Sequence, residues 1–217
     1  MRIAVLGTGV VGTTLGTGFV RSGHEVRLGS RSAGNEKALA WVAEAGDGAS
    51  EGNFADAAAW GEVVVNATGG LVSIDALTAA GADNLAGKVL LDVSNPLDFS
   101  DGFPPKVAHP DGRSLAEQIQ STFPAARVVK TLNTMNTVVM TDPRSLSGSH
   151  TVFVAGDDAD AKVLAAELLR EFGWENHEIV DAGGIDAARG LELYLPLWLS
   201  LMGSFGTPAF NVNVVRA

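Results

Sequence analysis

A glycine-rich turn near the N-terminus limits what this chain can fold into more than any other stretch. Residues Arg2–Leu6 form a short apolar run, which is typical of a strand buried on both faces. A G-x-G-x-x-G sequence follows at once and opens a helical segment; it consists of Gly7, Thr8, Gly9, Val10, Val11 and Gly12. A second short strand is expected over residues 25–29. Strand, glycine turn, helix and strand within about 30 residues predict a dinucleotide-binding unit.

The glycines of this turn suit a pyrophosphate. One glycine permits the tight turn, one lets the backbone approach the pyrophosphate, and one lets the helix pack closely on the strand. The positive end of the helix then faces the phosphates. We therefore predict that this turn binds a dinucleotide. The alternative is a glycine-rich strand-to-helix turn that binds no ligand.

The end of the second strand indicates which dinucleotide is bound. An NAD site usually has Asp or Glu at this place, where the carboxylate binds the ribose 2′-hydroxyl. This chain has Ser30, Arg31 and Ser32 there, and Lys37 follows shortly after. A guanidinium pairs with a 2′-phosphate through two parallel hydrogen bonds, whereas a carboxylate would repel it. The residues therefore predict NADP, with a solvated surface arginine as the alternative.

The charge distribution argues against polyanionic partners. The 217 residues carry a formal net charge of −10 at pH 7. Residues 1–37 contain five Lys or Arg against two acids, and the remaining 180 residues contain ten against 23. Such a chain repels nucleic acid and anionic membrane, and its one basic region coincides with the expected phosphate site. We expect small-molecule cofactors as ligands, with no nucleic acid and no membrane.

Cysteine content and the N-terminus indicate the compartment. The sequence has no cysteine, which excludes disulfides, thiolate metal sites and a cysteine nucleophile. The chain starts directly with a strand and shows neither a signal-peptide pattern nor about 18 uninterrupted apolar residues. We therefore expect a cytoplasmic protein.

Strands and helices alternate after residue 31. Apolar strands are expected over residues 62–67, 88–93, 127–132, 151–155 and 178–181. Helices are expected over 36–45, 54–60, 73–80, 115–122 and from Asp157 or Asp158 to 172, with a loop over 99–112. This succession predicts an α/β fold with a Rossmann-type doubly wound, mainly parallel sheet. Ligands of such sheets lie beyond the carboxyl ends of the strands, where 68–70, 94–96 and 133–136 are expected.

The C-terminal segment differs from the rest of the chain. Residues 184–205 have helical character and are apolar on nearly every side, and Pro196 in the middle should kink the helix. Such a helix must be buried on every face, so a partner subunit or the ligand cleft should cover part of it. We expect a homodimer, with packing against the chain's own sheet as the alternative. We therefore expect two parts, an NADP-binding Rossmann domain (1–182) and a small C-terminal helical segment (183–217) that contributes to the acceptor cleft and the dimer interface.

The ordered set of motifs resembles the coenzyme F420-dependent NADP oxidoreductase family. The resemblance rests on the glycine turn with Ser30 and Arg31, on 92–97, on 128–134, on 156–158 and on 180–184 with the apolar tail. Over the same segments, the chain is also similar to the cytosolic NADPH domain of metalloreductases. The resemblance implies NADP bound by residues of the glycine turn with Ser30, Arg31, Lys37, Thr68, Gly69 and Asn95.

The resemblance also implies hydride exchange with a deazaflavin (F420) or flavin that lies against the nicotinamide. Ser94, Pro96, Asn133 and Met202 are the residues expected on this acceptor side. Two positions depart from the family pattern. Gly69-Gly70 stands where members that reduce F420 tend to carry Pro and Trp, and Asn133 aligns with a histidine on the deazaflavin side. Both departures affect the acceptor side and spare the NADP side.

No acid–base constellation and no metal-ligand spacing stand out, so no catalytic side chain and no metal are predicted. Direct hydride transfer needs proximity, orientation and exclusion of water. Lys130 and Asp92 keep a second possibility open, in which the chain reduces a small carbonyl or imine with NADPH. A third possibility is an NADP-binding sensor without catalysis, whose interface would be the apolar tail.

Overall fold

The computed structural model describes residues 1–109 and 112–215. The main-sheet strands are β1 (Arg2–Leu6), β2 (Glu25–Ser30), β3 (Ala49–Asn53), β4 (Val63–Asn66), β5 (Val89–Asp92), β8 (Arg127–Thr131), β9 (Val152–Ala155) and β10 (Ile179–Gly183). The short strands β6 (Leu97–Asp98) and β7 (Lys106–Val107) form a separate hairpin. The helices are α1 (Val10–Arg21), α2 (Glu36–Ala45), α3 (Phe54–Trp60), α4 (Ser73–Ala80), α5 (Ala82–Leu85), α6 (Leu115–Thr122), α7 (Thr137–Thr141), α8 (Ala159–Glu171), α9 (Ala188–Leu193) and α10 (Leu195–Phe205).

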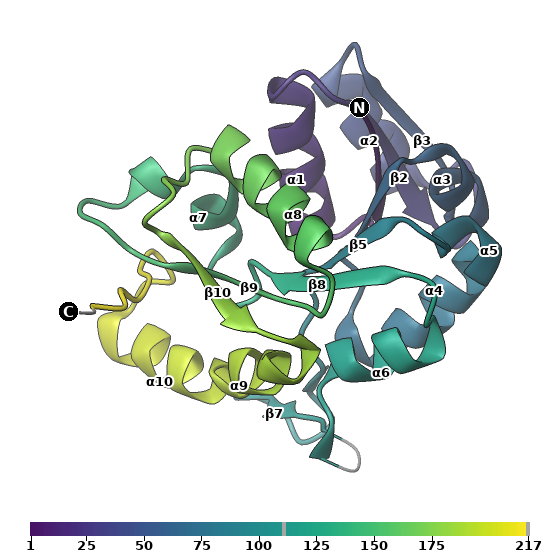
Figure 1. The fold of residues 1–217 in the computed structure, drawn as a ribbon. Helices are drawn as coiled ribbons and strands as arrows, with labels where there is room; N and C mark the ends of the chain where they lie inside the picture. The colour runs from purple at the N-terminus through teal and green to yellow at the C-terminus, as the bar shows by residue number, and fades with distance from the viewer. Residues whose placement is uncertain (110–111, 216–217) are drawn as a thin grey trace.

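The eight strands form one sheet in the order β10-β9-β8-β5-β4-β1-β2-β3 (Figure 1). All neighbours from β8 to β3 pair in parallel, and β9 pairs antiparallel with β8. The strand order reverses at β1, where the chain first runs outward to β3 and then returns to β4 on the other side. The predicted doubly wound, mainly parallel sheet is therefore confirmed.

Two apolar cores cover the two faces of the sheet, as the alternation of side chains along a strand requires. In β1, Ile3 and Val5 point into a core shared with α1, α2, α7 and α8. Ala4 and Leu6 point into the other core, which α3, α4, α5 and α6 complete. Both faces are therefore buried, which explains why the central strands are apolar runs.

Several helix boundaries follow from local capping chemistry. The side chain of Ser114 accepts a hydrogen bond from the Glu117 amide, and the Glu117 carboxylate accepts one from the Ser114 amide, so α6 begins with a capping box. Asp158 caps α8 and also pairs with Arg127, which lowers the pKa of Asp158 to about 2. Ser73 is the first residue of α4 and makes no cap. The turn Gly70–Val72 leads directly into this helix, so Ser73 lies inside the helix and does not cap it.

The expected elements leave out several that the structure contains, among them β3, the hairpin β6–β7, α5 and α7. The strand β3 contains Ser, Glu, Gly and Asn and has no apolar run, because it lies at the sheet edge beside β2 only. The hairpin β6–β7 lies within and beside the stretch expected to be a loop. The helix α7 has five residues, too few to show a helical period.

The C-terminal segment is two helices, α9 and α10, which lie end to end along one side of the molecule (yellow-green to yellow in Figure 1). Pro196 lies in the first turn of α10, where its missing amide costs nothing, so the expected kink in the middle of one helix is corrected to a break at Tyr194. Leu195 is buried, but Leu197 and Phe205 are exposed in the single chain. No helix in residues 1–109 and 112–215 is long and apolar enough to cross a membrane.

Candidate functional site

The three glycines of the first turn have three distinct environments. Gly7 has a φ of +120°, and a Cβ there would lie 2.5 Å from the carbonyl oxygen of Ala67. A Cβ on Gly12 would lie 2.1 Å from the carbonyl oxygen of Gly7, so this glycine lets α1 pack on its own turn. A Cβ on Gly9 would meet no atom within 4 Å. The open side of Gly9, at the N-terminus of α1, therefore leaves space for an anionic group near free backbone amides.

A hollow of about 750 Å³ opens beside this turn. It lies between the ends of β1, β2 and β4 and the helix α4, and its lining includes Gly7, Thr8, Gly9, Ser30, Arg31, Asn35, Phe54, Thr68, Gly69 and Asp75. The guanidinium of Arg31 is exposed and makes no ion pair or hydrogen bond with any residue that the structure describes. An arginine without a protein partner at the mouth of a hollow is available to a ligand anion.

Ser30 and Lys37, the other residues expected at the 2′-phosphate, differ from Arg31 in their surroundings. Ser30 is buried and donates its hydroxyl to the carbonyl oxygen of Ser32 at 2.7 Å. Lys37 is exposed in the first turn of α2 and does not line the hollow. Asn35, which caps α2, does line it, and the sequence interpretation did not single it out.

A second hollow of about 260 Å³ adjoins the first, and both are lined by Ala67, Thr68 and Gly69. Its further lining comes from the carboxyl ends of β4, β5 and β8 and from α7 and α10; it includes Val11, Gly70, Ser94, Asn95, Asn133, Met135, Asn136, Met140, Leu195 and Trp198. None of its described lining residues carries a titratable side chain. We call the 750 Å³ space the outer hollow and this one the inner hollow.

The two glycines after β4 are not equivalent. A Cβ on Gly69 would touch only Val72, at 3.8 Å, so the hollow is open beside this residue. A Cβ on Gly70 would lie 2.2 Å from the carbonyl oxygen of Asn95, because the backbone after β5 packs directly on it. Of the two glycines, only Gly69 therefore leaves the hollow open.

Asn133 is held by a reciprocal pair of amides at the end of β8. Its Nδ2 donates to Oδ1 of Asn95 at 2.9 Å and to the carbonyl oxygen of Leu191 at 3.1 Å. Asn95 in turn donates its Nδ2 to the carbonyl oxygen of Asn133 at 2.8 Å. The preceding Leu132 has a φ of +61°, an unusual conformation for a branched residue that these bonds help to hold. Asn95, which was expected to bind NADP, and Asn133, which was expected on the acceptor side, thus lie in direct contact.

A buried ion cluster lies beneath the inner hollow. Lys130 contacts Asp92 and Glu192 at 2.8 Å each and donates to the carbonyl oxygen of Ser94, and all three ionisable side chains are fully buried. Asn66 donates to Asp92 at 2.9 Å. Lys130 and Asp92 are thereby unavailable to a substrate in this conformation.

Glu192 joins the C-terminal segment to the rest of the chain. Its carboxylate accepts from the amide of Leu115 at 2.8 Å and from the amide of Ala116 at 3.2 Å, at the N-terminus of α6. His109 lies 2.8 Å from the same carboxylate. Each oxygen of Glu192 therefore has more than one polar partner, as a buried carboxylate requires.

The cluster shifts the pKa of its members. Burial lowers the pKa of Lys130, but the carboxylates of Asp92 and Glu192 outweigh it, so that the net shift is upward. Burial also raises the pKa of Asp92, and Lys130 only partly offsets this effect. Lys130 thus holds its proton more firmly than a free lysine, which is the opposite of what a proton-donating catalytic lysine needs.

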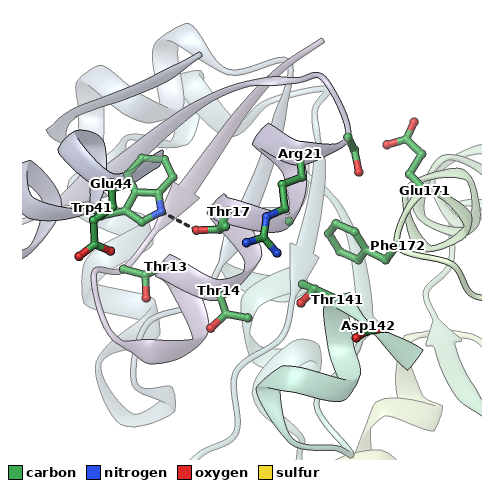
Figure 2. A pocket seen from close by; sticks show the side chains of 12 residues that line it. Thr13, Thr14, Thr17, Arg21, Trp41, Glu44, Thr141, Asp142, Glu171 and Phe172 are labelled. Atoms are coloured by element: carbon green, nitrogen blue, oxygen red, sulfur yellow. Dashed lines mark hydrogen bonds between the residues drawn. The ribbon is translucent and has the colours of Figure 1, made fainter. Parts of the chain in front are cut away.

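A third hollow, of about 450 Å³, lies on the other side of α1 and shares no lining residue with the first two (Figure 2). Figure 2 shows the Thr17 hydroxyl accepting a hydrogen bond from the indole of Trp41, at 3.0 Å, while Arg21 reaches across the space. It lies away from the glycine turn, so we do not assign it to the site.

Comparison with known proteins identifies the family. Residues 2–96 match the family described as "NADP oxidoreductase coenzyme F420-dependent". The crystal structure of a candidate F420-dependent NADP reductase from Arthrobacter sp. FB24 is 49% identical, covers 100% of both chains and superposes with a TM-score of 0.93. The chain belongs to this family. It is therefore a member of a family of NADP-dependent oxidoreductases.

More distant relatives share parts of the chain. Metalloreductase STEAP3 of Rattus norvegicus is 32% identical over 206 residues, which are 91% of this chain and 38% of that protein. The chain thus spans well under half of the metalloreductase. A reductive aminase from Aspergillus terreus, solved with NADPH4, is 20% identical over 94% of this chain and 62% of its own, with a TM-score of 0.67. This likeness shows the fold alone.

Not every residue expected from the family lies at the hollows. Met202 lies on α10 but is not a lining residue, whereas Leu195 and Trp198 of the same helix are. Pro96 is buried behind Gly70, and Val10 and Gly12 belong to the turn without lining either space. Helical spacing could have placed Trp198 beside Leu195 and Met202, but no local signal distinguishes which of them faces the sheet.

The ion cluster predicts a large effect of one substitution. Lys130→Met keeps the length of the side chain but leaves two buried carboxylates without their cation, so the free energy of unfolding should fall by about 3–5 kcal/mol. Urea denaturation measures this change. Lys106→Met is the matched control, because its ion pair with Asp101 is exposed and should contribute about 1 kcal/mol or less. Equal losses in the two variants would contradict the assigned role of Lys130.

Proposed function

We propose that the protein transfers a hydride between NADP(H) and a deazaflavin ring such as that of coenzyme F420, or a flavin ring. The observation that carries this proposal is the pair of adjoining hollows. The outer hollow ends at the free guanidinium of Arg31, and the inner hollow has no titratable side chain among its described lining residues. One space suits the anionic end of the cofactor and the other suits a planar ring.

In this proposal the cofactor lies across the carboxyl ends of β2, β1, β4 and β5. The guanidinium of Arg31 pairs with the 2′-phosphate, and Ser30 and Lys37 lie close in the chain. The backbone amides of the turn from Gly7 to Gly12, with Thr8, Val10 and Val11, bind the pyrophosphate at the N-terminus of α1. Thr68, Gly69 and Asn95 lie along the nicotinamide half.

The chemistry of the inner hollow favours a ring acceptor. A hydride added to a deazaflavin or flavin leaves negative charge spread over the ring system, which can take its proton from water afterwards. A hydride added to a small carbonyl leaves a localised alkoxide, which is stabilised best by a positioned acid. The described lining of the inner hollow offers no such acid, and Lys130 and Asp92 are buried in their own cluster. The proposed role of the protein is therefore positioning and exclusion of water.

The acceptor side supports a tolerant site. Gly69 leaves the hollow open at one wall, and Asn133 places a neutral amide where related chains are expected to carry a histidine. Because this wall carries no bulky side chain and no charged group, discrimination among rings of similar shape should be modest. Ser94 and Pro96 belong to the segment expected beside the ring, and Met202 is proposed to approach it from α10.

We also propose that a second copy of the chain covers α10. Leu197 and Phe205 are 55% and 57% exposed on a helix whose one buried residue is Leu195. Large apolar side chains repeated along one helix are typical of an interface. Light scattering at micromolar concentration should give twice the mass of the chain, and Leu197→Asp should give a monomer. A monomeric wild-type protein would contradict the homodimer.

Cofactor choice provides the next test. Arg31→Ala should weaken NADPH binding by about 2 kcal/mol, because it removes a charge-assisted pair with the 2′-phosphate, and should leave NADH binding nearly unchanged. Calorimetric titration measures both affinities. Arg21→Ala is the control, since it removes the same charge from the far end of α1. The assignment of Arg31 fails if the wild type binds NADH and NADPH equally well.

The acceptor is tested by turnover. NADPH oxidation should be measured with F420, with FMN and riboflavin, and with small ketones and cyclic imines under the same conditions. We expect F420 to be reduced, FMN or riboflavin to be reduced more slowly, and the ketones and imines to be inert. Oxidation of NADPH by a ketone or imine, without turnover of any tricyclic ring, would establish the carbonyl or imine reductase instead. If the protein binds NADPH but turns over none of these compounds, the remaining possibility is an NADP-binding sensor without catalysis.

A further inference from the structure

Two buried polar atoms of the inner hollow have no partner among residues 1–109 and 112–215. They are Oδ1 of Asn133, which follows β8, and Nε1 of Trp198, which lies in α10. Buried polar atoms in folded proteins are nearly always paired, and those left open deserve an explanation. Because both residues line the same hollow, a molecule bound there can supply the missing partners.

The amide orientation of Asn133 follows from its contacts. Its Nδ2 donates to the carbonyl oxygen of Leu191, which can only accept, so the nitrogen and oxygen cannot be exchanged without losing this bond. Asn95 is fixed in the same way by the carbonyl oxygen of Asn133. The open atom of Asn133 is therefore an oxygen, and it offers a hydrogen-bond acceptor on a side chain that is only 3% exposed.

Trp198 offers the complementary group. The indole Nε1 can only donate. Its ring stacks on Phe210 with 5.3 Å between the centroids and 20° between the planes, so the C-terminal tail holds the ring in place. The lining of the inner hollow therefore includes one residue with an unpaired donor and one with an unpaired acceptor, and Met135, Met140 and Leu195 are apolar members of the same lining.

We infer that Asn133 and Trp198 together bind an amide edge of a planar ring ligand, a carbonyl oxygen beside an N–H. Trp198 donates to the carbonyl oxygen, and Asn133 accepts from the N–H. This inference rests on the proposed function, which supplies two ligands of that chemistry. One is the carboxamide of the nicotinamide, and the other is the lactam edge of the deazaflavin or flavin ring.

The two sources are separated with ligand pairs that differ only in the N–H. NADP+ is compared with its 3-acetylpyridine analogue, in which a methyl group replaces the amide nitrogen, by calorimetric titration. Riboflavin is compared with N3-methylriboflavin by turnover with NADPH. Each pair is measured with the wild type, Asn133→Ala and Trp198→Phe. Trp60→Phe is the control, because Trp60 lies under Arg27 at the opposite part of the sheet.

The two variants should behave differently. The wild type should prefer the N–H member of at least one pair by roughly tenfold, the scale of one buried hydrogen bond. Asn133→Ala should abolish this preference, whereas Trp198→Phe should weaken binding or turnover of both members alike, since both keep the carbonyl. If Asn133→Ala loses the preference in the NADP+ pair, the bound amide edge is that of the nicotinamide. If it loses the preference in the riboflavin pair, the bound edge is that of the acceptor ring.

A purely structural role gives another result. If Asn133 only holds the backbone, Asn133→Ala weakens both members of each pair alike and the preference remains, which overturns the inference; thermal melting checks that each variant is folded. The inference is also overturned if the wild type binds both members of the NADP+ pair equally well and turns over both members of the riboflavin pair at the same rate. Normal NADPH turnover with no preference rejects only this inference, whereas a failure to bind NADP+ at all rejects the proposed function.

Discussion

The buried ammonium of Lys130 joins the parts of the chain that shape the inner hollow. It reaches Asp92 at the end of β5, the backbone of Ser94 and Glu192 of α9 from its own position on β8. Glu192 in turn accepts from the first amides of α6. A charge so deeply buried is stable only if all its partners stay in place. The position of α9, and of α10 after it, therefore depends on this cluster.

The same cluster is connected to the wall of the hollow by neutral hydrogen bonds. Asn66 donates to Asp92 and accepts from the hydroxyl of Thr68 at 2.7 Å, and Thr68 lines both hollows. Asn133 likewise joins Asn95 to the backbone of α9. Residues that face the proposed ligands are thus held by a polar network that is itself anchored in the core, which favours a preorganised site.

The sequence was informative where the signal is local. The glycine turn and the apolar strands each depend on neighbours within a few residues, and the structure has them at or within two residues of the expected places. Glu192 could not be predicted, because its partners are 62 to 83 positions away and a carboxylate in an apolar helix looks like a surface group. The choice of Trp198 over Met202 at the hollow also depends on tertiary packing. Local rules therefore predict the scaffold better than the acceptor side.

The proposed function depends on direct transfer of hydride from the nicotinamide to the acceptor ring. This transfer is tested most directly with NADPH carrying deuterium in turn at each of the two C4 positions, incubated with F420 in ordinary water. We expect that one of the two labelled forms delivers its deuterium to the ring carbon of the reduced deazaflavin, as mass spectrometry would detect. Reduced F420 that carries no deuterium from either form, or NADPH that is not oxidised by F420 at all, would contradict it.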